Sequence, residues 1–330
     1  MSTYTLPTNL REQVDAYRQA KIARIDGVLR SLGAEDEYAW GDVANSDLPL
    51  RYALAHHVFE GVSRAVREGD CQAISSAMAL RTDGASSLGP FQAEGSPIIL
   101  MHPAWRELTD DASLSENVAR SSAPVAIVSS RLCATATTAD RDLVTRALGT
   151  AVDAGFGATV LRNTRVIALI SELIPDDAKI RSWTTSALPA TAHLDYFTEN
   201  RYVSRELIHE AAHTELNDLF SALDVAGEIH RSDATFYAPW LETDRPVFGF
   251  LHGTWAFSHV ALFCRWLLNA HLGPEISAVA AMMHSRYVKQ LHASREDFSR
   301  AVEWVRVPEL AELLTRRRDD VLVGVGAGWA

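Results

Sequence analysis

The residues best able to do chemistry form one short pattern, His209-Glu210-Ala211-Ala212-His213. Two histidines four positions apart on an α-helix differ by about 40° in azimuth and about 6 Å in rise, so both imidazoles can reach one metal ion. The two alanines leave room between them. The pattern therefore predicts a metal site on a buried helix. In zinc hydrolases with this pattern, the glutamate is the general base that activates metal-bound water.

A catalytic metal needs about three protein ligands and keeps at least one position open. The extended metalloprotease pattern would place glycine at position 216 and histidine at position 219. This chain has Leu216 and Leu219 there, which excludes that class. A third ligand must come from further along the chain, where the candidates are Glu228, His230, Glu242, Asp244, His252 and His259.

The histidines among these candidates differ in their surroundings. His230 lies beside Arg231 in a polar stretch and fits a solvated loop histidine, whereas His259 lies among apolar residues and fits a satisfied core histidine. His252 begins an apolar helix and precedes Gly253, which permits a close approach of other groups. The spacing alone leaves the third ligand open.

Three stretches of the chain together resemble a known family. They are Arg205-Glu-Leu-Ile-His-Glu-Ala-Ala-His-Thr-Glu-Leu-Asn217, Tyr237-Ala-Pro-Trp240, and Asp244-Arg-Pro-Val-Phe-Gly-Phe-Leu-His-Gly-Thr-Trp-Ala-Phe257. The combination resembles the HExxH-motif peptide-modification family over about Thr191 to Leu272. That family implies a 2-oxoglutarate-dependent, non-haem iron enzyme that hydroxylates the β-carbon of an amino-acid side chain within a ribosomally made precursor peptide.

Carried over to this chain, the resemblance makes His209, His213 and His252 the iron ligands. Three histidines on Fe(II) leave three coordination positions, enough for 2-oxoglutarate and O₂. Members of the family tend to have an arginine directly after Pro-Trp, and this chain has Leu241 there. The expected cation for the 2-oxoglutarate carboxylate is therefore Arg245, with Arg265 as second choice, because a guanidinium binds a carboxylate in a bidentate manner. Either arginine also fits a structural ion pair.

The sequence suggests where a peptide would bind. The extended segment Ala190 to Phe197, which carries His193, is expected to form an edge strand beside the site and to pair with the substrate backbone. Further substrate-binding candidates are Tyr237, Trp240 and Trp255, although aromatic residues in such positions often belong to the core. In an oxygenase, Glu210 would not serve as a base and would instead orient a ligand or a bound water.

The hydrophobic periodicity predicts a mostly helical α+β protein, with a small sheet packed beside the HExxH helix. A strand pair is expected over Thr159 to Ile174, a loop region with short elements over Asp70 to Ala123, and a solvated helix end at Arg316-Arg317-Arg318. The expected helices are Thr8–Leu32, Leu48–Val66, Asp140–Ala154, Tyr202–Leu223, Phe250–Leu272, Ile276–Leu291 and Ser294–Arg318.

Composition narrows the function classes. The chain has 330 residues and a net charge of −11, which argues against a nucleic-acid partner because phosphate contacts need a basic face. Its 3 cysteines form no CxxC pair, so neither a disulfide framework nor a thiolate metal site is expected. The apolar stretch Thr254 to Leu272 contains charged and polar residues and fits a core helix, not a bilayer span. No secretion signal is evident, so we expect a cytoplasmic protein.

We expect a helical and loop region over residues 1–123 and a metal-binding catalytic region over residues 124–330, packed as one compact body. Three functions remain open. The first is an Fe(II)/2-oxoglutarate oxygenase acting on a precursor peptide. The second is a zinc metallopeptidase with Glu210 as general base, and the third is a non-catalytic relative that binds a peptide. The sequence leaves the oligomeric state and the peptide undetermined.

Overall fold

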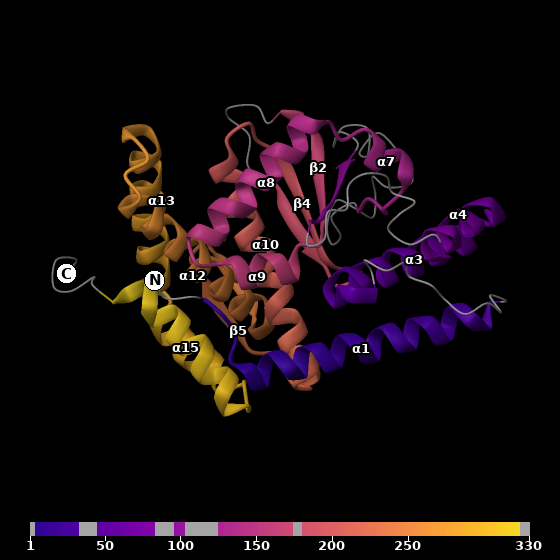
Figure 1. Ribbon diagram of the computed structural model, residues 1–330. Helices are drawn as coiled ribbons and strands as arrows, with labels where there is room; N and C mark the ends of the chain where they lie inside the picture. The colour runs from indigo at the N-terminus through magenta and orange to yellow at the C-terminus, as the bar shows by residue number, and fades with distance from the viewer. Residues whose placement is uncertain (1–3, 33–44, 83–95, 103–124, 174–179, 324–330) are drawn as a thin grey trace.

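A mixed four-stranded sheet lies beside the helix that carries the HExxH pattern (Figure 1). The computed structural model describes residues 4–32, 45–82, 96–102, 125–173 and 180–323. The strand order is β1-β2-β4-β3. Strands β1 (Ile98–His102), β2 (Val166–Leu173) and β4 (Leu188–Tyr196) run parallel, whereas β3 (Ser182–Thr185) is antiparallel to β4 and forms one edge.

Helix α10 (Asn200–Ala222) carries the HExxH pattern and is surrounded by other elements. It packs against β3 and β4 of the sheet and against helices α1 (Thr8–Ser31), α8 (Thr138–Asp153), α9 (Gly157–Asn163) and α12 (Val247–Asn269). A helix that is buried on most sides needs apolar or small residues all round. Leu207, Ile208, Ala211 and Ala212 supply them, each with no exposed surface. The backbone that presents the two histidines is therefore held on most sides.

The N-terminal helices lie at one side of this central body and extend away from it (Figure 1). They are α1 (Thr8–Ser31), α3 (Leu48–Glu68) and α4 (Cys71–Thr82). Helix α3 begins where the Asp47 side chain accepts a hydrogen bond from Leu50 N, and it ends at Gly69 with φ +71°, a conformation that favours glycine. The described part of the chain between β1 and β2 contains helices α7 (Ser130–Ala134), α8 (Thr138–Asp153) and α9 (Gly157–Asn163).

The C-terminal part adds a hairpin and the remaining helices. Strands β5 (Thr235–Ala238) and β6 (Thr243–Pro246) form a separate antiparallel pair, which leads directly into α12 (Val247–Asn269). The other helices are α11 (Ala226–His230), α13 (Pro274–Ala293), α14 (Arg295–Val302) and α15 (Pro308–Leu322). Among the described residues, α12 is the helix long and apolar enough to cross a membrane, but 83% of its apolar window is buried inside the protein, as in a core helix.

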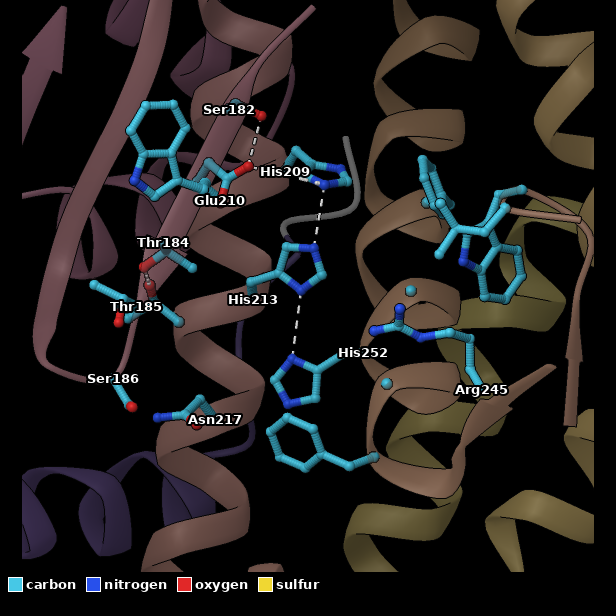
Figure 2. A pocket seen from close by; sticks show the side chains of 18 of the residues that line it. Ser182, Thr184, Thr185, Ser186, His209, Glu210, His213, Asn217, Arg245 and His252 are labelled. Atoms are coloured by element: carbon cyan, nitrogen blue, oxygen red, sulfur yellow. Dashed lines mark hydrogen bonds and ion pairs between the residues drawn. The ribbon is translucent and has the colours of Figure 1, made fainter. Parts of the chain in front are cut away.

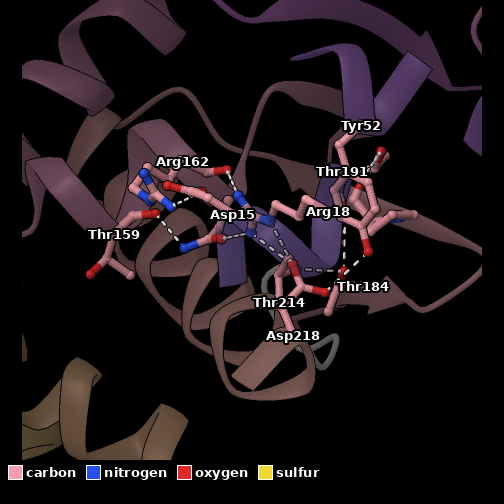
Figure 3. A network of polar contacts seen from close by, with 11 residues as sticks. Asp15, Arg18, Tyr52, Thr159, Arg162, Thr184, Thr191, Thr214 and Asp218 are labelled. Carbon is pink, nitrogen blue, oxygen red and sulfur yellow. Dashed lines mark hydrogen bonds and ion pairs between the residues drawn. The ribbon is translucent and has the colours of Figure 1, made fainter. Parts of the chain in front are cut away.

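A buried polar network ties α1 to α10 (Figure 3). The Arg18 guanidinium donates through Nε to Asp218 Oδ2 at 2.9 Å and through Nη2 to Asn163 Oδ1 at 2.5 Å. Tyr52 OH donates to Asp218 Oδ1 at 3.2 Å. Arg18 and Asp218 are 1% and 0% exposed, so their charges are compensated mainly by each other and by hydrogen bonds such as these. The network fixes α1 and α3 against the helix that bears the candidate site.

The predicted fold class is confirmed, since the protein is mostly helical with a small sheet beside the HExxH helix. Several element predictions are wrong. The first half of the expected strand pair is helix α9, the loop region contains helix α4, and the C-terminal helix is broken into α14 and α15. The rest of the expected loop region, at 83–95 and 103–123, and the expected boundary between residues 123 and 124 lie outside the described residues.

Two corrections concern exposure and pairing. Arg317 and Arg318 are 6% and 4% exposed and therefore do not form a solvated helix end; their guanidinium groups lie over the Trp255 and Phe298 rings. The segment Ala190 to Phe197 is not an edge strand either. It belongs largely to β4, which has β2 on one side and β3 on the other; the edge strands of the described sheet are β1 and β3, and β3 is the one beside α10.

Candidate metal centre

A pocket of about 630 Å³ opens between β3, α10 and the first turns of α12 (Figure 2). The β3 edge and the loop after it form one wall, and the β5–β6 hairpin region contributes the opposite wall. The residues that line the pocket are Ser182, Trp183, Thr184, Thr185, Ser186, Pro189, His209, Glu210, His213, Thr214, Asn217, His230, Trp240, Leu241, Arg245, Phe248, Gly249, His252, Gly253 and Phe257. The structure thus brings the HExxH pattern, Trp240, Arg245 and His252 to one cavity.

Three imidazoles form a row in this pocket (Figure 2). His209 Nε2 lies 3.1 Å from His213 Nε2, and His213 Nδ1 lies 3.4 Å from His252 Nδ1. The His209 and His213 rings meet at 80°, whereas the His213 and His252 rings are stacked at 10° with centroids 5.6 Å apart. Helix α10 supplies two of the rings and α12 the third.

Burial keeps all three rings uncharged. It lowers the pKa of His209 to about 4, with a smaller contribution from the positive charge of Arg205. It also lowers the pKa of His213 and of His252 well below the ordinary value for histidine. A neutral imidazole has a lone pair available, which is the form that binds a metal ion.

The donor set fits a transition metal, but the ring orientations fit it only in part. Two donors about 2.1 Å from a metal and at about 90° to each other are about 3.0 Å apart, close to the 3.1 Å between Nε2 of His209 and Nε2 of His213. His252 turns Nδ1 to the far side of the His213 ring, and its Nε2 is buried without a hydrogen-bond partner. In the described part of the chain, no three His, Cys, Asp or Glu donors already surround one point. His252 would have to turn its ring to act as the third ligand.

Glu210 is held by a hydroxyl. Ser182 Oγ lies 2.6 Å from both Glu206 Oε2 and Glu210 Oε1. A hydroxyl has one hydrogen and can donate to one of them only, so the other carboxyl must donate to the hydroxyl oxygen. Glu206 also forms an ion pair with Arg205 at 2.5 Å. Burial raises the pKa of Glu210 to about 8, so in the metal-free protein Glu210 is the carboxyl expected to carry the proton.

Arg245 and Trp240 lie across the glycine face of α12 (Figure 2). A Cβ added at Gly249 would meet Arg245 Nε and Nη2 at 3.1 Å, and one added at Gly253 would meet the Trp240 indole at 2.6 Å. Because these two glycines have no side chain, the Arg245 guanidinium and the Trp240 indole can pack directly against the backbone of α12. Among the described residues, no carboxylate forms an ion pair with Arg245, which lies exposed at the pocket wall.

Other predicted site residues lie away from the pocket. Trp255 is 1% exposed and packs in the core against His259, and His193 is fully buried behind Trp183, on which it stacks at 5.1 Å. Tyr237 is 47% exposed on β5 and does not line the pocket, and Arg265 donates from α12 to Asp320 O at 2.7 Å. The structure therefore does not support a direct binding role for these four residues.

The remaining candidates for the third ligand separate clearly. His230 lines the pocket and its ring lies 4.2 Å from that of Phe248, nearer the site than a solvated loop histidine would be. His259 is buried and its Nδ1 lies 2.8 Å from Trp255 O, as a core histidine does. Glu228 pairs with Arg306 at the surface. Glu242 and Asp244 are exposed and lie outside the pocket lining.

Sequence reasoning missed the polar wall of the pocket. Ser182, Thr184 and Thr214 had no assigned role, yet Thr184 Oγ1 lies 3.1 Å from Thr214 Oγ1, one residue beyond His213. The available signal was the polar, β-branched stretch Ser182-Trp-Thr-Thr185, one strand ahead of the HExxH helix. Such residues on a short extended segment are typical of an edge strand, whereas the edge strand was expected at Ala190 to Phe197.

No protein-family model and no curated protein sequence matches this chain. The resemblance to the HExxH-motif peptide-modification family therefore remains a prediction based on its motifs. Any assignment of a function to this protein therefore rests on those motifs and on the residues that line the pocket.

Proposed function

We propose that this protein is an Fe(II)- and 2-oxoglutarate-dependent oxygenase that hydroxylates the β-carbon of a side chain in a ribosomally made peptide. The observation that carries the proposal is the row of three uncharged imidazoles from α10 and α12 at one pocket, opposite an arginine without a carboxylate partner among the described residues. His209, His213 and His252 would hold the iron. When bound, iron, 2-oxoglutarate and O₂ supply the oxidising chemistry for an unactivated carbon.

The protein's own residues would orient the bound groups and keep water out of the site. The Arg245 guanidinium is placed to bind the distal carboxylate of 2-oxoglutarate, because it lies at the pocket wall and offers two parallel donors. Trp240 and Phe257, whose ring centroids are 5.4 Å apart, form an apolar side of the cavity that limits access of water. Glu210, held by Ser182, is expected to keep the α10 turn in register and not to act as a base.

A zinc peptidase is the second candidate. One observation favours it, namely that Glu210 lines the pocket with Oε1 3.9 Å from His209 Nε2, where a general base would be needed. Against it, this same oxygen is engaged by the Ser182 hydroxyl and is not free to accept a proton from water. A non-catalytic peptide-binding relative would show neither activity.

Spectroscopy of the full chain tests the proposal without a known peptide. Anaerobic addition of Fe(II) and then 2-oxoglutarate to metal-free protein is expected to produce a visible charge-transfer absorption that neither addition produces alone. Zinc in the purified protein together with hydrolysis of peptides would overturn the proposal in favour of the peptidase. No absorption change and no hydrolysis would overturn both enzymatic functions.

The arginine assignment is tested by a matched pair of variants. Arg245→Met is expected to raise the 2-oxoglutarate concentration for half-maximal absorption about tenfold or more, since a charge-assisted bidentate contact is lost. Arg265→Met is the control, because that guanidinium contacts the Asp320 carbonyl, away from the pocket. An equal effect of both substitutions, or none, would contradict the role of Arg245.

A further inference from the structure

The free edge of β3 faces the pocket. Strand β3 is the last in the order β1-β2-β4-β3, so no strand of the described part pairs with its outer side. Residues 182–186 all line the cavity. An unpaired strand edge offers a row of backbone N–H and C=O groups, which an extended chain can satisfy.

The register shows which residues turn their backbone toward the pocket. Asp195 N donates to Arg181 O at 3.0 Å, so Arg181 faces β4. Alternate residues of an antiparallel strand face the same neighbour, so Trp183, opposite His193, also faces β4. Ser182 therefore directs its N–H and C=O groups outward. The β3–β4 register shifts between Trp183 and Thr185, and Thr184 has no β4 partner in that register; because it lies between two residues that do pair with β4, we assign its N–H and C=O groups the same outward direction.

Side chains of the same two residues lock β3 to the HExxH turn (Figure 2). Ser182 Oγ bonds Glu210, and Thr184 Oγ1 bonds Thr214, the residues that follow the two α10 histidines. Two strand residues span about 6.7 Å and four helical residues about 6 Å, so β3 and this turn of α10 run side by side. A chain added at the usual strand spacing of about 4.8 Å would extend along the same turn.

We propose that β3 binds the substrate as an added antiparallel strand, a linear peptide in extended conformation whose backbone pairs with Ser182 and Thr184. The hydroxylation of the peptide rests on the proposed function; the way in which the peptide binds does not. Directly opposite residues of an antiparallel pair point to the same face. The peptide residues opposite Ser182 and Thr184 therefore point toward α10, and the side chain to be hydroxylated is one of these two, which are separated by one residue.

The first test uses an mRNA-displayed library of random 12-residue linear peptides, selected on the full chain with Fe(II) and 2-oxoglutarate under anaerobic conditions. For the recovered peptides, Thr184→Pro is expected to weaken binding about tenfold, because proline removes the outward N–H and also crowds the edge. Thr184→Val is the matched comparison: it also removes the hydroxyl and its contact with Thr214 but keeps the N–H, so its loss of affinity should be clearly smaller than that of Thr184→Pro. Equal losses in both variants, or no recovered peptides, would overturn edge pairing.

A second measurement keeps the test independent of the folding of the proline variant. N-methylation of one peptide amide at a time, with wild-type protein, is expected to weaken binding at every second residue, since only alternate amides face β3. Losses without a period of two would overturn the proposal. Binding requires no turnover, so peptides that pair in this way but release no succinate would contradict the proposed function alone. If peptides are hydroxylated but their binding is insensitive to N-methylation, only the proposed strand pairing is contradicted.

Discussion

His213 is the central residue of the candidate site because each of its ring nitrogens lies against another imidazole. Nε2 lies beside His209 and Nδ1 beside His252. A neutral imidazole has one N–H and one lone pair, so it can donate to one of these neighbours and accept from the other. A metal at Nε2 would bind the lone pair and leave the hydrogen on Nδ1, toward His252. Metal binding is thus coupled to the tautomer of the whole row.

We expect His213→Ala and His209→Ala each to reduce affinity for Fe(II) or Zn(II) at least about 100-fold, since each removes half of the preformed nitrogen pair. His252→Ala is expected to weaken binding less, because its ring does not yet face the pair. Competition with a chromophoric chelator measures all three affinities. His292→Ala, at an exposed position on α13, is the control. Unchanged affinity in His252→Ala would remove it from the ligand set.

Glu210 should make the stability of the metal-free protein depend on pH. Its pKa is about 8 in the folded protein against 4.5 for a free carboxyl, so between these values the folded state binds more protons than the unfolded state. Stability then falls as pH rises through this window, by on the order of a few kcal/mol at most. Glu210→Gln is expected to flatten this decline.

Urea unfolding at pH 5 and pH 8 measures the effect, with exposed Glu309→Gln as the matched control. If wild type and Glu210→Gln lose the same stability between these two pH values, Glu210 is not the protonated one of the two carboxyl groups that contact Ser182.

At the scale of elements, the glycine face of α12 determines where the β5–β6 hairpin packs. Gly253→Ala places a methyl group 2.6 Å from the Trp240 indole, a distance at which the ring must move. We expect a loss of stability of about 1 to 3 kcal/mol and a changed tryptophan fluorescence. Gly149→Ala in α8 is the control, because nothing lies within 4 Å of its added Cβ and a helical alanine is more stable than glycine by about 1 kcal/mol. Equal stability of the two variants would argue against this contact.

The local sequence pattern was enough to predict those elements in which buried residues recur at a single helical or strand spacing. Helix α10 lies within two residues of its predicted start and one of its predicted end, and the pair His209 and His213 follows from helical spacing alone. Thr159 and Val160 misled the prediction, because β-branched residues favour strands. Here they form helix α9, where packing against α10 overrides that preference.

Other parts of the site depend on contacts that no local pattern contains. The strand order that makes β3 an edge brings together segments from both halves of the chain, so the free edge was assigned to the wrong strand. Trp255 follows His252 by three residues, so helical spacing alone does not separate it from the pocket; its burial against His259 does.

For the whole molecule, the Arg18–Asp218 pair is expected to be the main polar link between the N-terminal helices and α10. Arg18→Leu should cost about 3 to 5 kcal/mol, because it leaves Asp218 buried without a counter-charge. The exposed pair of Arg300 and Asp297 is the comparison, and Arg300→Leu should cost about 1 kcal/mol or less. Thermal or urea unfolding measures both losses. A small effect of Arg18→Leu would mean that α1 is held by apolar packing alone.

This pairing also has a consequence for how the protein is made. Arg18 and Asp218 are 200 residues apart in the chain. At about 5 to 20 residues per second, a ribosome needs about 10 to 40 seconds to travel from one to the other. Throughout that interval Asp218 is not available to Arg18. Helix α1 can pack against α3 as soon as that helix has been made, but it reaches its place on α10 only after the HExxH helix has emerged.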